Sequence, residues 1–158
     1  MGKIFLISSN ICTEPYPVYP LGMAVIAGSL KAAGHQIYQF DWLVANRSFF
    51  SLEKKLKEFS PDFVGVSIRN IDNVDSLTCD ENWYLTEVQN LVRHVREITS
   101  GPIILGGPGF SLLPEEILEY VGADYGVVGE GEEKICYLID RLEKKLPVDR
   151  IIRKNKRK

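Results

Sequence analysis

The chain has 158 residues, of which 45% are hydrophobic and 25% charged, a composition typical of a single globular domain. Its net charge of −2 gives no general attraction to nucleic acid, and no apolar run approaches the roughly 20 residues of a membrane span. The cysteines, Cys12, Cys79 and Cys136, are odd in number and widely spaced, which favours a reducing, cytoplasmic environment and offers no metal-ligand spacing. Because Met1 leads directly into an apolar run, we also expect no signal peptide.

Short apolar runs alternate with helical patterns along the chain. Runs typical of buried strands cover residues 3–8, 36–40, 62–68, 103–105 and 125–128. Helical patterns cover residues 21–33, the segment from the expected cap Ser51 to Pro61, and residues 83–99, 114–121 and 132–144. In the first of these helices, Leu21, Val25 and Leu30 are expected to pack on the sheet, and Gly34 ends the helix. The small residues Gly22, Ala24, Ala27 and Gly28 are expected to allow close packing there. The alternation predicts an α/β fold: a flavodoxin-like (Rossmann-like) three-layer sandwich whose five-stranded parallel sheet has the order 2-1-3-4-5.

Unusual residues gather in the loops that follow the predicted strands. In this topology ligands bind outside the carboxyl ends of the strands. The runs 103–105 and 125–128 both end in glycine clusters, and glycine permits close approach of another backbone or of a flat ligand. The long polar loop over residues 69–82 lies at the same edge, and long loops in compact domains are often functional. We therefore expect one binding site built from neighbouring strand ends.

Several familiar site types are absent from these loops. The chain contains no Gly-x-x-x-x-Gly-Lys-Ser/Thr loop, and the first loop has no Gly-x-Gly-x-x-Gly pattern. A phosphate-accepting response regulator needs paired acidic residues after the first strand, where this chain has Ser8, Ser9 and Asn10. A flavin- or nucleotide-binding module stays open as an alternative, with Tyr16, Tyr19 and Trp83 available to flank a ring. A non-catalytic interaction domain with purely structural glycines is the other alternative.

An ordered set of short motifs gives a more specific indication. The set comprises Pro20-Leu21-Gly22-Met23-Ala24, Leu30 to Gly34, Pro61 to Ser67, Gly106-Gly107-Pro108, Leu113-Pro114-Glu115-Glu116 and Val127-Val128-Gly129-Glu130-Gly131-Glu132. It resembles the N-terminal cobalamin-binding domain of cobalamin-dependent radical S-adenosylmethionine enzymes, over residues 3 to 145. The resemblance implies that cobalamin is the cofactor and that its nucleotide tail inserts beside the sheet.

The resemblance also implies which residues bind. The Ser-x-Leu element of the family maps to Ser67-Ile68-Arg69, with arginine in place of leucine, and its Gly-Gly element maps to Gly106-Gly107. Cobalamin carries many amide side chains, which suit a loop with mixed donors and acceptors. The expected cofactor-binding residues are Asn10, Ser67, Ile68, Arg69, Asn70, Asp72, Asn73, Gly106, Gly107, Pro108, Gly109, Gly129, Glu130, Gly131 and Glu132.

Two departures from the family pattern carry predictions. The Asp-x-His-x-x-Gly motif of methyl-transferring cobalamin proteins is missing, and neither His35 nor His94 is placed to reach cobalt. We therefore predict cobalamin with its own base displaced and no protein imidazole bound to the cobalt.

The Cys-x-x-x-Cys-x-x-Cys loop of the radical enzymes is also missing. S-adenosylmethionine and a [4Fe-4S] cluster would then belong to a catalytic domain in cis, beyond this chain, which alone is expected to be non-catalytic. The domain is expected to cover residues 1–145, followed by a basic linker or tail without regular structure over 146–158.

Overall fold

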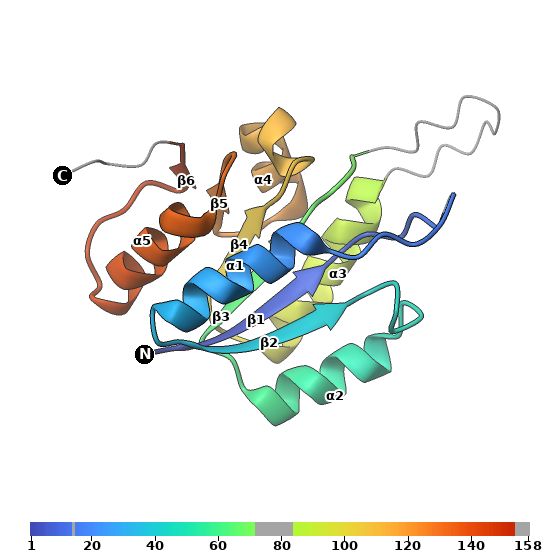
Figure 1. Ribbon diagram of the computed structural model, residues 1–158, viewed down its shortest axis with the longest axis horizontal. Helices are drawn as coiled ribbons and strands as arrows, with labels where there is room; N and C mark the ends of the chain where they lie inside the picture. Colours follow the sequence, from blue (N-terminus) through green and yellow to red (C-terminus); the bar gives the residue numbers. More distant parts are fainter. Residues whose placement is uncertain (14, 72–83, 154–158) are drawn as a thin grey trace.

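The computed structural model describes residues 1–13, 15–71 and 84–153. These ranges form a parallel sheet with helices on both faces (Figure 1). The strands are β1 (Lys3–Ser8), β2 (Gln36–Asp41), β3 (Phe63–Ser67), β4 (Ile103–Gly106), β5 (Tyr125–Val127) and β6 (Ile151–Ile152). The helices are α1 (Leu21–Ala32), α2 (Phe49–Phe59), α3 (Tyr84–Ile98), α4 (Pro114–Val121) and α5 (Glu132–Glu143), with a short 3-10 helix, η1 (Phe110–Leu112), before α4. No helix in the described ranges combines the length and apolar character needed to cross a membrane.

The sheet has the order β2-β1-β3-β4-β5-β6, and every neighbouring pair is parallel. The predicted α/β class and the order of the first five strands are confirmed. The predicted number of strands is wrong by one, because Ile151 and Ile152 pair with β5 instead of belonging to an irregular tail. The Gly126 N–H donates to the Arg150 carbonyl and the Val128 N–H donates to the Ile152 carbonyl, so β6 satisfies the edge of β5. The rest of the basic tail, residues 154–158, lies outside the described ranges.

Side chains alternate between two cores along each central strand. Phe5 and Ile7 of β1 pack on the face covered by α2, α3 and α4, whereas Ile4 and Leu6 pack on the face covered by α1 and α5. Both faces of the sheet are therefore buried, as parallel sheets require. This explains why the strands read as continuous apolar runs and not as polar–apolar alternation.

The first turn of α2 begins earlier than its sequence pattern predicts. The Ser48 hydroxyl accepts a hydrogen bond from the Ser51 N–H at 3.2 Å, so Ser48 is the N-cap and the assignment of the cap to Ser51 is wrong. The reason is the packing of Phe49, whose ring centroid lies 4.9 Å from that of the buried Trp42. This contact favours a helix that begins at Phe49.

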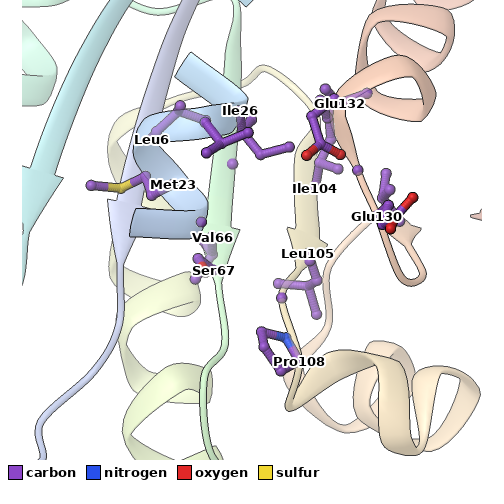
Figure 2. A pocket seen from close by; sticks show the side chains of 18 of the residues that line it. Leu6, Met23, Ile26, Val66, Ser67, Ile104, Leu105, Pro108, Glu130 and Glu132 are labelled. Atoms are coloured by element: carbon purple, nitrogen blue, oxygen red, sulfur yellow. The ribbon is translucent and has the colours of Figure 1, made fainter. Parts of the chain in front are cut away.

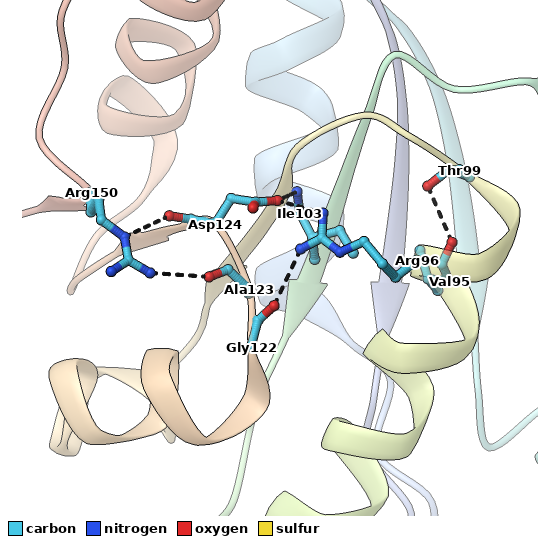
Figure 3. A network of polar contacts seen from close by, with 8 residues as sticks. All are labelled: Val95, Arg96, Thr99, Ile103, Gly122, Ala123, Asp124 and Arg150. Carbon is cyan, nitrogen blue, oxygen red and sulfur yellow. Dashed lines mark hydrogen bonds and ion pairs between the residues drawn. The ribbon is translucent and has the colours of Figure 1, made fainter.

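A polar network fastens the amino ends of the last strands to α3 (Figure 3). The Asp124 carboxylate accepts hydrogen bonds from the Ile103 N–H at 2.8 Å and from Arg96 at 2.9 Å. Arg96 also donates to the Gly122 carbonyl, and Arg150 donates to the carbonyl of Asp124. Asp124 thus links the start of β4 to α3 through its carboxylate, and it contacts the segment that leads into β6 through its backbone carbonyl.

Replacing Asp124 with alanine is expected to lower the free energy of unfolding by about 1–2 kcal/mol, because it leaves the Ile103 N–H and Arg96 without their acceptor. Both charged side chains are more than one-third exposed, which screens the pair and keeps the expected loss modest. Urea denaturation measures the change. Asp140→Ala removes an exposed carboxylate paired with Lys144 and serves as the control, with an expected change within about 0.5 kcal/mol. Equal effects of the two substitutions would contradict the bridging role of Asp124.

Candidate functional site

A cavity of about 580 Å³ lies between α1, α5 and the carboxyl-end half of the sheet (Figure 2). Its size is within the range of about 300–1,000 Å³ that small-molecule and cofactor sites occupy. The strands β1, β3, β4 and β5 contribute to its lining, at the sheet edge where the topology predicts a ligand. In Figure 2, Met23 and Ile26 of α1 lie on one side of the cavity, and Glu130, between β5 and α5, and Glu132, the first residue of α5, lie on the other.

The cavity exists because small residues occupy the strand positions that face α1 and α5. Side-chain alternation directs Gly65 and Ser67 of β3 and Gly106 of β4 to this face. The Leu6 side chain covers the position of Gly65, since a Cβ there would lie 2.7 Å from a Leu6 methyl group. At Gly106 the Val127 carbonyl oxygen, at 3.8 Å, is the only atom of the described residues within 4 Å of such a Cβ. The space above Gly106 is therefore left for a ligand.

Helix α1 contributes a wall that the sequence pattern did not predict. Leu21 and Val25 were expected to pack on the sheet, but they are 67% and 43% exposed and line the cavity. Met23, Ala27 and Leu30 pack on the sheet, at helical spacing, so Ala27 and Leu30 follow the prediction and Met23 was not predicted. The sequence did hold one indication that α1 has a second apolar contact: its apolar residues are distributed around the whole helix. A helix that packs against the protein on a single side has a narrower apolar stripe.

The three glycines after β4 have different structural roles. Gly107 has a φ of +98°, and a Cβ there would lie 2.5 Å from the Ile68 carbonyl oxygen. At Gly109 a Cβ would lie 3.0 Å from the Arg69 carbonyl oxygen. These two glycines make room for the protein's own β3–α3 connection, whereas Gly106 faces the cavity.

Ser111 joins the two glycine-rich loops, and the sequence reading missed it. Its hydroxyl donates to the Gly107 carbonyl at 3.0 Å and accepts from the Gly129 N–H at 2.9 Å. The Lys134 ammonium donates to the Val128 carbonyl at 2.8 Å and holds the second loop from the other side. Both loops therefore have fixed positions at the mouth of the cavity.

Polar side chains are few in the lining. Besides Ser111 it includes Ser67, whose carbonyl accepts two hydrogen bonds from Ser9, at 3.2 Å from the N–H and 2.8 Å from the hydroxyl. Within the described ranges no side chain or backbone group is hydrogen-bonded to the Ser67 hydroxyl. Glu130 and Glu132 are the charged members of the lining. The site thus combines an apolar interior with a hydroxyl and two carboxylates, an arrangement suited to holding a ligand.

The structure brings eight of the predicted binding residues to the cavity: Ser67, Gly106, Gly107, Pro108, Gly129, Glu130, Gly131 and Glu132. Ile68, Arg69, Asn70, Gly109 and Asn10 do not line it. Ile68 is buried in the core on the opposite face of the sheet, and the Asn10 side chain is hydrogen-bonded to the backbone of Cys12.

Other residues noted in the sequence lie away from the cavity or outside the described ranges. Asp72, Asn73 and Trp83 belong to residues 72–83, which the structure does not describe. Tyr16 and Tyr19 are exposed and do not line the cavity. They therefore do not flank a ring bound there.

Both histidines lie away from the cavity. The His35 Nδ1 atom accepts a hydrogen bond from the Gly2 N–H at 3.0 Å, at the amino end of the sheet. His94 lies on α3 against the Phe49 ring, with ring centroids 4.5 Å apart, on the opposite face of the sheet. No cluster of three or more histidine, cysteine or acidic side chains in the described part of the chain has the geometry of a metal site.

Comparisons with known proteins agree with this geometry. Tryptophan 2-C-methyltransferase from Streptomyces laurentii is 31% identical over 157 residues, which cover 95% of this chain and 24% of that protein. TsrM from Kitasatospora setae, a radical S-adenosylmethionine methyltransferase solved with cobalamin and a [4Fe-4S] cluster bound, superposes with a TM-score of 0.83 at 27% identity, covering 92% of this chain and 25% of that one. The cobalamin-dependent S-adenosylmethionine radical enzyme OxsB shares the fold, with a TM-score of 0.66 at 21% identity over 94% of this chain and 19% of that one.

The chain spans about a quarter of the length of the curated relatives it matches. A family model described as "B12 binding domain" matches residues 10–139, which is most of the chain. This match and the likeness to TsrM confirm the resemblance drawn from the motifs and the predicted cofactor class, cobalamin. The chain belongs to the B12-binding domain family.

Proposed function

We propose that the cavity between α1 and α5 holds the nucleotide tail of cobalamin, and that the domain serves a radical S-adenosylmethionine methyltransferase whose catalytic domain is in the same polypeptide. The observation that carries the first part is the space above Gly106, which is bounded by apolar walls and which no segment of residues 1–13, 15–71 or 84–153 fills. The relatives, named as methyltransferases and about four times longer than this chain, support the second part. We place the protein in the cytoplasm because three widely spaced cysteines suit a reducing compartment.

Each part of the lining has a role in this proposal. The apolar side chains enclose the base of the tail, and the Ser67 hydroxyl donates a hydrogen bond to a polar atom of the nucleotide. Glu130 and Glu132 accept hydrogen bonds from the amide side chains of the corrin ring. Gly107 and Gly109 shape the loop, and Gly107 also lines the cavity. When bound, cobalamin supplies a cobalt centre that carries a methyl group.

Residues beyond the cavity would meet the rim of a much larger ligand. Arg69 and Asn70 follow β3 at the same edge of the sheet, and Asn10 follows β1. We propose that these three residues, together with Asp72 and Asn73, contact corrin amides outside the cavity. Mixed donors and acceptors suit such amides better than charge of one sign.

We also propose that no protein imidazole or thiolate binds the cobalt. His35 and His94, the two histidines of the chain, lie at the far end and on the opposite face of the sheet. Cys136 follows the lining residue Ile135, but burial raises the pKa of its thiol. A thiol that stays protonated at neutral pH is a poor metal ligand.

Reconstitution with hydroxocobalamin tests the proposal. After removal of free cofactor, we expect a red protein with one corrinoid per chain. We also expect the reduced Co(II) form to give an electron paramagnetic resonance spectrum without nitrogen hyperfine splitting from an axial ligand. Flavin mononucleotide serves as the control ligand and should not be retained. A colourless protein would overturn the cofactor assignment, and nitrogen splitting would overturn the base-displaced, imidazole-free coordination.

A further inference from the structure

We infer that the cavity selects among natural corrinoids by their lower base, and favours a benzimidazole over a purine. This inference rests on the proposed function, in which the nucleotide tail occupies the cavity. The base forms the far end of that tail, beyond the phosphate and the ribose. It therefore reaches furthest into the cavity, and the chemistry of the deep walls decides which base fits.

Aliphatic side chains from the sheet and from both helices form most of the cavity walls. Leu6 of β1, Ile104 of β4 and Val127 of β5 form the floor, and all three belong to the core cluster on the α1–α5 face. Met23 of α1 and Ile135 of α5 belong to the same cluster and close the sides. A flat group that enters between them exchanges water for aliphatic carbon on both faces.

Polar backbone groups near these walls already have partners. The Gly106 carbonyl accepts from the Ile68 N–H at 2.8 Å, and the Gly107 carbonyl accepts from the N–H and the hydroxyl of Ser111. The Val128 carbonyl accepts from the Lys134 ammonium at 2.8 Å. Besides Ser111, the polar side chains that line the cavity in the described part of the chain are Ser67, at the end of β3, and Glu130 and Glu132 on the β5–α5 side (Figure 2).

The two classes of base make different demands on such a cavity. When displaced from the metal, dimethylbenzimidazole presents two methyl groups, aromatic C–H edges and one ring nitrogen. Adenine presents an amino group and several ring nitrogens, which lose their hydrogen bonds to water on entry. A buried polar group without a partner weakens binding by about tenfold or more. The apolar walls therefore favour the benzimidazole and penalise the purine.

Three corrinoids separate this inference from the proposed function. We would titrate the chain with hydroxocobalamin, with its adenine-containing counterpart and with cobinamide, which lacks the tail, and follow tryptophan fluorescence and the corrinoid retained after dialysis. We expect cobalamin to bind at least about tenfold more tightly than the adenine form. Equal affinity for the two complete corrinoids, with cobinamide weaker, would overturn base selection and leave the tail site standing. Equal affinity for all three, or no binding, would overturn the proposed tail site itself.

A pair of matched variants tests the wall directly. Val127→Thr places a hydroxyl in the cavity floor with almost no change in shape, and should lower the preference for cobalamin over the adenine form by about threefold or more. Val64→Thr makes the same change at a buried position on the opposite face of the sheet, outside the cavity lining. It should leave the preference unchanged, and melting curves establish that both variants are folded. An unchanged preference in folded Val127→Thr would contradict the role of the wall, as would an equal shift in both variants.

Discussion

Replacing Gly106 with leucine is expected to abolish the tail-dependent part of cobalamin binding while the domain stays folded. A side chain at this position enters the cavity, because among the residues that the structure describes only the Val127 carbonyl oxygen lies within 4 Å of the Cβ position, at 3.8 Å. The leucine would fill the volume reserved for the base and remove the burial of an aromatic group, worth about 3 kcal/mol or roughly 100-fold in the dissociation constant. Equilibrium dialysis with cobalamin and cobinamide measures the effect, and the two affinities should become nearly equal.

The free energy of unfolding of Gly106→Leu should remain within about 1 kcal/mol of that of the parent chain, since the new side chain meets open space. Gly28→Leu is the matched control. Gly28 is exposed on α1, outside the cavity, and has nothing within 4 Å of its Cβ position. This control should bind cobalamin like the parent chain. A folded Gly106→Leu protein that binds cobalamin with unchanged affinity would show that the tail lies elsewhere.

Replacing the adjacent Gly107 with alanine is expected to have the opposite outcome, a large loss of stability. Its φ of +98° is unfavourable for an L-residue, and its Cβ would lie 2.5 Å from the carbonyl oxygen of Ile68 and 3.0 Å from the Ile68 nitrogen. Backbone strain of this kind costs about 1–3 kcal/mol, and displacing the β3–α3 connection adds to it. We expect a total loss of about 3 kcal/mol or more in the free energy of unfolding, measured by urea denaturation.

Gly122→Ala separates the two contributions to that loss. Gly122 ends α4 with a φ of +77°, but nothing lies within 4 Å of its Cβ position. Its substitution therefore reports the conformational cost alone, expected to be about 1 kcal/mol. If Gly107→Ala were no more destabilising than Gly122→Ala, the loop could shift freely and the packing against Ile68 would not constrain it.

The fold was largely predictable because the buried strands and the helices leave strong local patterns. Strands β1 to β5 are apolar runs between helical segments, and alternation of this kind leaves few topologies. Strand β6 was missed because Ile151–Ile152 is too short to show any period, and its pairing with β5 is a tertiary contact. The start of α2 was misplaced because Ser48 and Ser51 are both suitable caps, and only the contact of Phe49 with Trp42 decides between them.

The site was predictable in place but not in detail. Topology directs a ligand to the strand ends, and the glycine clusters marked two of the loops correctly. Sequence alone could not tell that Gly106 faces a cavity while Gly107 faces Ile68, because the difference lies in backbone conformation. It also could not indicate that Ser111 joins the loops, since serine is common in turns. The contribution of α1 was hidden because Leu21 and Val25 look like core residues.

The small residues that open the cavity at Gly106 and Ser67 have little part in holding the sheet together, because the two cores on either face are built from other positions. On β3 and β4, the residues that open the cavity are therefore different from those that build the core, although Leu6, Ile104 and Val127 both line the cavity and belong to the core. A single bulky substitution at the end of β4 is therefore expected to close the cavity while the scaffold keeps its shape. When chains of this fold are compared, we expect the size of the residue at the position of Gly106 to indicate whether the cavity can hold a cofactor.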